Sequence, residues 1–156
     1  GDLDGDGDFE LVVGRTFDDE RTGSIKVYSD TQDDPLGAVV LELAGEVRHI
    51  RFGWESLVAD FNGDGHPDLV VAAPGSLLLN LPGNIHIFPG PLEQMSWDSA
   101  VTWTSGAAHN DQFGVSMAAF DQDGDGDLEL IVGAPYFSQV AYQAGAVFSI
   151  EDPLPE

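Results

Sequence analysis

Short apolar runs, bounded by glycine and acidic residues, recur along the 156-residue chain. The runs at 69–71 (LVV) and 130–132 (LIV) are too short for a helix and rich in β-branched residues, which predicts buried strands. The segments 54–59 and 115–120 precede them and predict the first strand of a hairpin in each case. No helical pattern is convincing anywhere in the chain. The pattern therefore predicts an all-β fold.

Three stretches of the chain repeat one another. Each holds an acidic, glycine-containing loop followed by an apolar run: residues 1–14 (GDLDGDGDFELVVG), 59–74 (ADFNGDGHPDLVVAAP) and 120–135 (FDQDGDGDLELIVGAP). Other residues recur at the same distance from the loops. A Phe-Gly pair stands eight residues before the second and third loops, and a glycine opens a later β-type run in each unit: Gly23, Gly83 and Gly145. The repeat divides the chain into a partial unit at 1–51, a unit at 52–112 and a partial unit at 113–156.

The segments 38–43 and 100–105 follow the glycine-led runs and predict a further strand in the first and second units. A complete unit therefore has four predicted short strands. Four strands in a repeat of this length are typical of a β-propeller blade, a four-stranded antiparallel sheet. The first unit lacks its opening strand and the third lacks an obvious fourth, which leaves about two and a half blades. Propellers close with four to eight blades, so we expect further blades from the same polypeptide or from copies. Because the chain begins inside an acidic loop, we expect it to be a piece of a longer protein, forming one propeller segment over 1–156.

Composition limits the partners that the chain can bind. An apolar content of 42% predicts a folded core, and 28 acidic against 5 basic residues give a net charge of -23. Such a charge argues against nucleic acid and anionic lipid, and it favours cations. The absence of cysteine excludes disulfides and thiolate metal sites, and no apolar run is long enough for direct membrane insertion.

The acidic loops place oxygen-bearing side chains at alternating positions. Positions in each loop are numbered from its first aspartate. The predicted metal ligands are the side chains at positions 1, 3, 5 and 9 and the backbone carbonyl at position 7. The ligand residues are Asp2, Asp4, Asp6, Asp8 and Glu10 in the first loop, Asp60, Asn62, Asp64, His66 and Asp68 in the second, and Asp121, Asp123, Asp125, Asp127 and Glu129 in the third. Glycine at position 6 permits the sharp turn that points these oxygens inward. A shell of six to eight hard oxygens favours Ca²⁺, because Mg²⁺ keeps its waters and Zn²⁺ prefers His or Cys. We therefore expect up to three calcium ions.

The acidic loops have two other interpretations. An EF-hand needs a glutamate at position 12 and flanking helices, whereas position 12 here is valine and the flanks are strand-like. Solvated turns rich in aspartate and glycine are common, but three such loops in register favour cation sites. Ca²⁺ sites of extracellular affinity would be largely empty in a cytosol, so we expect an extracellular or cell-surface protein.

The series FG, DxNGDGxxDLVV and a GAP-like triplet resembles the FG-GAP repeat of integrin α-subunit and glycosylphosphatidylinositol-specific phospholipase D propellers. It is carried by residues 52–74 (FGWESLVADFNGDGHPDLVVAAP) and 113–135 (FGVSMAAFDQDGDGDLELIVGAP). The resemblance implies a seven-bladed propeller with calcium in the hairpin loops and ligand binding elsewhere. The sequence departs from the pattern at the Ala72-Ala73-Pro74 triplet, after Gly14, and at position 9, which is glutamate in two loops.

No catalytic constellation is present, so we expect no enzyme activity in this piece. His49, His66, His86 and His109 have no metal-ligand spacing and are expected to be surface or packed residues. The aromatic residues with a candidate role in binding or in the core are Trp54, Trp97, Trp103, Tyr136, Phe137 and Tyr142.

The favoured function is a calcium-stabilised adhesion or interaction module with a protein or glycan ligand. The alternatives are the propeller of a larger secreted hydrolase and a structural repeat of a surface filament.

Overall fold

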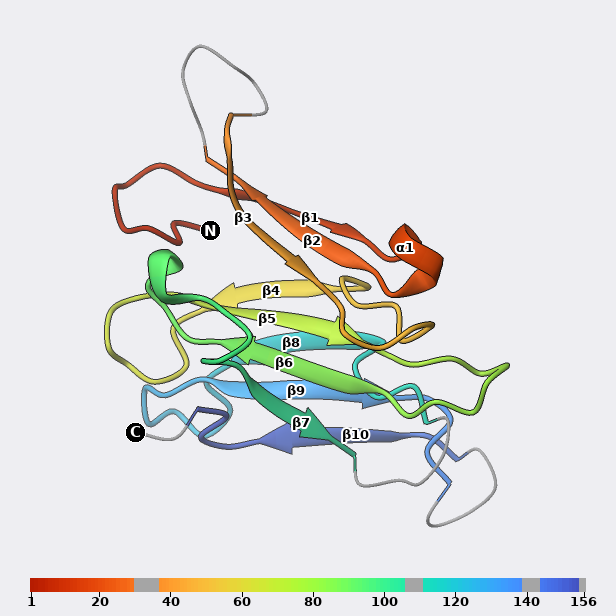
Figure 1. Cartoon of the computed structure of the whole chain (residues 1–156). Helices are drawn as coiled ribbons and strands as arrows, with labels where there is room; N and C mark the ends of the chain where they lie inside the picture. The colour runs from red at the N-terminus through yellow and green to blue at the C-terminus, as the bar shows by residue number, and fades with distance from the viewer. Residues whose placement is uncertain (30–36, 106–110, 139–143, 155–156) are drawn as a thin grey trace.

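The computed structural model describes residues 1–29, 37–105, 111–138 and 144–154. Within them, ten strands form three antiparallel sheets that lie one behind the other (Figure 1). The first sheet has the order β1 (Leu11–Arg15), β2 (Ser24–Tyr28), β3 (Val39–Ala44). The second has the order β4 (Ser56–Ala59), β5 (Asp68–Ala73), β6 (Asn84–Phe88), β7 (Val101–Thr104). The third has the order β8 (Ser116–Phe120), β9 (Glu129–Ala134), β10 (Ala146–Ile150). The predicted all-β class is confirmed.

The two complete acidic loops connect hairpin strands, as the repeat predicts. Ala59 pairs with Asp68 at the end of the β4–β5 hairpin, and Phe120 pairs with Glu129 at the end of the β8–β9 hairpin. Every sheet therefore places the loop of its unit before an equivalent strand, β1, β5 or β9. The arrangement fixes the acidic loops at one end of the sheets (Figure 1).

The core lies in two layers, one on each face of the second sheet. All six residues of β5 are buried, because Leu69, Val71 and Ala73 face the first sheet while Val70 and Ala72 face the third. A strand covered on both faces has no polar side, which explains the continuous apolar run in its sequence.

The repeated glycines and phenylalanines pack one unit against the next. Phe52 and Phe113 are fully or almost fully buried. A Cβ atom at Gly23 would collide with the carbonyl oxygen of Phe52, and one at Gly83 would collide with that of Phe113. Each Phe-Gly pair therefore approaches the glycine that opens the third strand of the preceding unit, which requires the missing side chain.

Two single turns depart from the expectation that the chain has no helix. α1 (Asp18–Arg21) lies in the β1–β2 connection, where Asp18 Oδ2 contacts Arg15 Nε at 3.0 Å and accepts a hydrogen bond from Ser24 Oγ at 3.0 Å. η1 (Leu92–Gln94) follows β6. Turns of three or four residues leave no periodic apolar pattern, so the sequence did not indicate them.

The outer sheets have three strands each, and the second sheet has four. Their outward faces carry exposed apolar side chains: Leu11 and Val39 in the first sheet, Phe120 and Val147 in the third. Such faces are what stacked propeller blades would bury, although the number of blades and the unit boundaries stay predictions. Among the described residues, no helix is long and apolar enough to cross a membrane.

Candidate metal centres in the acidic loops

The first aspartate of each loop closes the loop through hydrogen bonds from its glycines. In the first loop, Asp2 Oδ1 accepts from Gly5 N at 2.7 Å and Asp2 Oδ2 accepts from Gly7 N at 3.2 Å. In the third loop, Asp121 accepts from Gly124 N and Gly126 N at 2.6 and 3.0 Å. The second loop shares the contact to position 6, in which Asp60 Oδ2 accepts from Gly65 N at 2.9 Å.

Positions 3, 5 and 7 form a ladder of short-range hydrogen bonds in every loop. The N–H of position 5 donates to the side chain of position 3 at 3.1–3.2 Å, and the N–H of position 7 donates to position 5 at 2.8–3.0 Å. These bonds hold positions 3, 5 and 7 of each loop in a tight turn. The three loops, separated by about sixty residues in sequence, therefore adopt one conformation.

Carboxylates gather closely in the first and third loops. One oxygen each from Asp2, Asp4 and Asp6 lies within 4.8 Å of the others, as does one each from Asp121, Asp123 and Asp125. In the second loop Asn62 stands at position 3, and its Nδ2 donates to Asp64 Oδ2 at 3.0 Å. The second loop thus has one carboxylate fewer, and its amide takes part in the same cluster.

Asp60 provides a test of whether a cation fits the second loop. Its Oδ1 is buried and has no hydrogen-bond partner among the described residues. A buried carboxylate oxygen without a partner costs free energy, which a divalent ion bound to that oxygen would remove. Since the neighbouring donors are also hard oxygens, the residues present fit Ca²⁺.

The carboxylate at position 9 is buried in all three loops and ties the loop to the sheet. Its oxygen accepts the backbone N–H of position 2: Glu10 from Leu3 at 2.5 Å, Asp68 from Phe61 at 2.8 Å, and Glu129 from Gln122 at 2.5 Å. Glutamate can therefore replace aspartate here with the same contact.

Asp68 illustrates the electrostatic cost of this arrangement. Burial raises the pKa of its carboxyl, the negative charges of Asp64 and Asp60 raise it further, and hydrogen bonds from Gly90 N and Phe61 N oppose these effects. A bound cation would favour the ionised carboxylate.

Position 7 was predicted to supply a backbone carbonyl. The side chains of Asp8, His66 and Asp127 are exposed, in agreement with a role for the backbone alone. The glycine at position 6 has a positive φ in each loop, 98°, 86° and 105°, so the predicted need for glycine at this turn is confirmed. Participation of the fifteen predicted residues in metal binding remains a prediction.

The candidate aromatic and histidine residues have mixed environments. His86 is packed, with its ring 5.0 Å from that of Trp97 and its Nδ1 2.9 Å from Thr102 Oγ1, and burial lowers the pKa of His86 to about 4. Phe137 is buried, whereas Trp54 and Tyr136 are 41% and 36% exposed. His66 is exposed and His49 is half-buried, while His109 and Tyr142 lie outside the described residues.

Sequence reasoning missed a buried carboxylate near the third unit. Asp111 is fully buried, accepts hydrogen bonds from Gly83 N and Phe113 N at 3.2 Å each, and contacts Ser105 Oγ. It supports the contact between units. It stands two residues before Phe113, whereas Ile50 stands two residues before Phe52, so the repeat gave no signal for it.

The geometry of the loops and of the Phe-Gly contacts agrees with one protein family. The family model described as "FG-GAP repeat" matches residues 52–88 and 113–150. The chain contains FG-GAP repeats. The matched segments include both complete acidic hairpins and the glycine-led strands β6 and β10, so the predicted resemblance is confirmed.

Relatives of these FG-GAP units include two kinds of protein. The chain is 34% identical to phosphatidylinositol-glycan-specific phospholipase D of Homo sapiens, over 94% of this chain and 19% of that protein. It is 32% identical to the same-named protein of Dictyostelium discoideum, over 68% of this chain and 12% of that protein. It is also 32% identical to integrin alpha-V of Gallus gallus, over 86% of this chain and 13% of that protein. The chain thus spans less than a fifth of the length of these relatives.

Proposed function

We propose that this chain is a calcium-binding segment of an extracellular β-propeller that serves adhesion or another protein or glycan interaction. The observation that carries the proposal is the common conformation of the three acidic loops, with the unpaired, buried Oδ1 of Asp60 in the second. Backbone N–H groups of each loop donate hydrogen bonds to side chains of the same loop. The resulting conformation brings the negatively charged side chains of the loop close together. A divalent ion in each would neutralise two of the excess negative charges.

Calcium in these loops is a structural component of the fold. At millimolar free Ca²⁺ and a Kd of ~10⁻⁴ M, each site adds about 1.4 kcal/mol and three sites add about 4 kcal/mol. That sum is comparable with the whole free energy of unfolding of a domain, roughly 5–15 kcal/mol. Sites of this assumed affinity would fill at extracellular Ca²⁺ concentrations and stay largely empty in a cytosol, in keeping with the proposed extracellular location.

Thermal unfolding at increasing Ca²⁺ concentration tests the proposal. We expect the Tm of the chain to rise by roughly 10 °C between excess chelator and millimolar Ca²⁺, because ligand binding to the folded state alone stabilises it. Mg²⁺ at the same concentration serves as the control and should give a much smaller rise, since it retains its water ligands. A Tm that does not respond to Ca²⁺ would refute the proposal.

A second candidate function is the propeller part of a larger secreted hydrolase. It is favoured by the 34% identity to phosphatidylinositol-glycan-specific phospholipase D of Homo sapiens, which extends over 94% of this chain. Both candidates share the calcium sites and differ in what the intact polypeptide contains. Mass spectrometry of the native protein distinguishes them, because peptides from a catalytic domain on the same polypeptide would support the hydrolase.

A further inference from the structure

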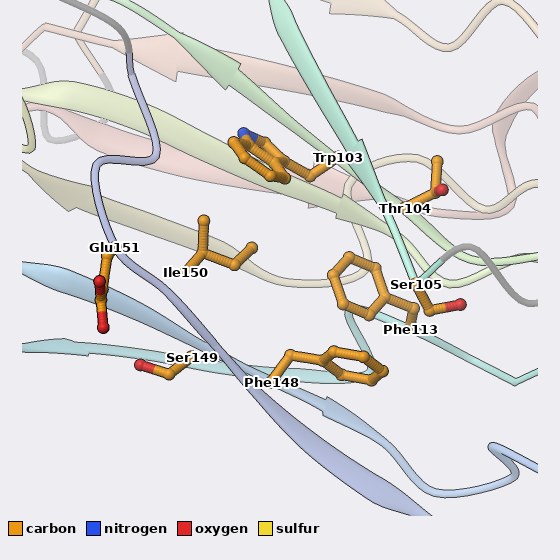
Figure 2. Close-up of a pocket in the computed structure, with 8 residues that line it drawn as sticks. All are labelled: Trp103, Thr104, Ser105, Phe113, Phe148, Ser149, Ile150 and Glu151. Carbon is orange, nitrogen blue, oxygen red and sulfur yellow. The ribbon is translucent and has the colours of Figure 1, made fainter. Parts of the chain in front are cut away.

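The acidic loop of the second unit, residues 60–68, lies in the sheet that has four strands, and it joins β4 directly to β5. A cavity of about 500 Å³ beside β10 has a different setting. Trp103, Phe113 and Phe148 contribute to its lining (Figure 2), and it lies at the edge of the three-stranded third sheet, where a fourth strand is expected. The chemistry of the second loop, in contrast, needs no further strand.

The second loop contains an asparagine followed by glycine, Asn62-Gly63, which is the one such pair in the sequence. The other asparagines, Asn80, Asn84 and Asn110, precede leucine, isoleucine and aspartate. The backbone nitrogen after an asparagine can attack the side-chain amide carbon, and glycine resists this ring closure least because it has no Cβ. Gly63 is exposed, and a Cβ built on it would meet no atom within 4 Å, so the loop has room for a ring and for water.

The attacking nitrogen is engaged in the first and third loops but not in the second. Gly5 N and Gly124 N, at position 4, donate hydrogen bonds to the first aspartate of their loops at 2.7 and 2.6 Å. In the second loop, no described residue accepts a hydrogen bond from Gly63 N, and Asp60 Oδ1 is the buried oxygen without a partner. The nitrogen of Gly63 therefore needs to break no bond within the protein before it reacts.

The amide of Asn62 is held and polarised by the next acidic residue. Asn62 Oδ1 accepts a hydrogen bond from Asp64 N at 3.1 Å, and Asn62 Nδ2 donates to Asp64 Oδ2 at 3.0 Å. The bond to Oδ1 draws electron density from Cγ, and it stabilises the negative charge that forms on the oxygen during attack. The second loop thus combines a free nucleophile with an activated amide carbon.

We propose that Asn62-Gly63 is a site of spontaneous deamidation in the folded protein. The nitrogen of Gly63 forms a bond to Cγ of Asn62 and loses its proton, the Cγ–Nδ2 bond breaks, and ammonia leaves. Water then opens the cyclic imide. Attack of water at Cγ gives aspartate, and attack at the backbone carbonyl carbon gives isoaspartate, in which the main chain runs through the former side chain.

The two products change the second loop in opposite ways, a consequence that rests on the proposed calcium function. Aspartate supplies the carboxylate that Asp4 and Asp123 supply in the other loops, where the N–H of position 5 donates to it at 3.2 Å. The corresponding contact to Asn62 is 3.1 Å, so aspartate fits the same turn. Isoaspartate lengthens the backbone by one methylene group and displaces the turn. Aspartate should therefore strengthen Ca²⁺ binding and isoaspartate should weaken it.

Peptide mapping by mass spectrometry tests the site itself. The folded 156-residue protein is incubated at mildly alkaline pH without added Ca²⁺, below its Tm. Position 62 should gain one mass unit at least roughly tenfold faster than Asn80 and Asn84, because only Asn62 precedes glycine. Asn62→Gln should remove this change, since the longer side chain must close a six-membered ring. Equal rates at the three asparagines, or no change at position 62, would overturn the proposal.

The third loop offers a matched control for the free nitrogen. Asp123→Asn places an asparagine before Gly124, in the same turn, but Gly124 N is bonded to Asp121. Position 123 of this variant should deamidate roughly tenfold more slowly than position 62, because a hydrogen bond to a carboxylate must break first. Equal rates at the two positions in the folded variant would contradict the role assigned to the free Gly63 nitrogen.

Isothermal titration with Ca²⁺ tests the consequence of the reaction. Asn62→Asp reproduces the aspartate product and should raise the Ca²⁺ affinity of the second loop at least roughly threefold. The isoaspartate form, separated by chromatography, should bind Ca²⁺ more weakly than the parent at one site. Unchanged affinity in both forms would refute this consequence. The mass change needs no Ca²⁺, so deamidation and the proposed calcium function can fail separately.

Discussion

At the scale of single residues, the unpaired Oδ1 of Asp60 gives the sharpest test of ion binding. Asp60→Asn keeps the size of the side chain and removes its charge, so we expect Ca²⁺ affinity of the second loop to fall by at least roughly tenfold. Isothermal titration should show the loss of one class of site while the others remain. The matched control is Glu93→Gln, an exposed substitution outside the loops. Equal Ca²⁺ binding by both variants would exclude Asp60 as a ligand.

His86 provides a prediction on pH. Burial holds its pKa at about 4, below the ordinary value of 6.5, so the folded protein binds fewer protons than the unfolded chain between these values. Its contribution to stability is fully present above pH 6.5 and is lost as pH falls toward 4, by up to about 3 kcal/mol. Urea unfolding between pH 7 and 4 measures this loss.

The control for His86 comes from the third unit, where Phe148 stands at the equivalent position. His86→Phe should remove that part of the pH dependence while acidic groups continue to titrate as before. The informative quantity is the difference in the free energy of unfolding between the two proteins as a function of pH. A constant difference from pH 7 to 4 would show that His86 does not titrate in this way.

At the scale of elements, the hairpin loops depend on the backbone at position 6. Gly65 has a φ of 86° and open space where a Cβ would lie, so substitution there is costly for conformational reasons alone. We expect Gly65→Ala to lower the free energy of unfolding by about 1–2 kcal/mol. Gly65→Asn should cost less, because asparagine tolerates left-handed conformations. Urea unfolding in Ca²⁺ compares the two, and equal effects would contradict the conformational explanation.

The repeat made the strands and hairpins predictable, because three copies of one pattern fix both the strand order and the register. Predicted first strands at 54–59 and 115–120 begin one or two residues before β4 and β8. The oxygens at positions 1, 3 and 5 of the first and third loops also lie close together, since their alternation is local.

Other features depend on contacts between units and gave no local signal. The hydrogen bond from the N–H of position 2 to the carboxylate of position 9 requires the folded hairpin. Trp97 reaches Ala44, 53 residues earlier in the chain, and nothing in the sequence around either residue indicates that contact.

At the scale of the whole molecule, the exposed sheet faces predict association. Val147 is 74% exposed and Phe120 is 47% exposed on the outward face of the third sheet, where another blade would pack. We expect the chain to self-associate with increasing concentration in sedimentation velocity experiments, since burial of apolar surface favours contact.

Charged or polar substitutions on that face separate association from stability. The double variant Val147→Lys and Phe120→Ser should sediment as a monomer at concentrations where the parent chain associates. The control is Phe9→Ser, which removes a side chain that is equally 74% exposed but lies in the first acidic loop. Association that persists in the double variant would show that another surface is responsible.

The acidic loops all project from the same end of the sheets (Figure 1), so their negative charge is concentrated at that end. At an anionic surface of the kind that the proposed extracellular role implies, that end would be repelled in calcium-poor solution, so the opposite end would approach first. Ca²⁺ ions bound in the loops, as proposed, would weaken this preference. Calcium would then govern which way the protein faces when it arrives, in addition to how firmly it is folded.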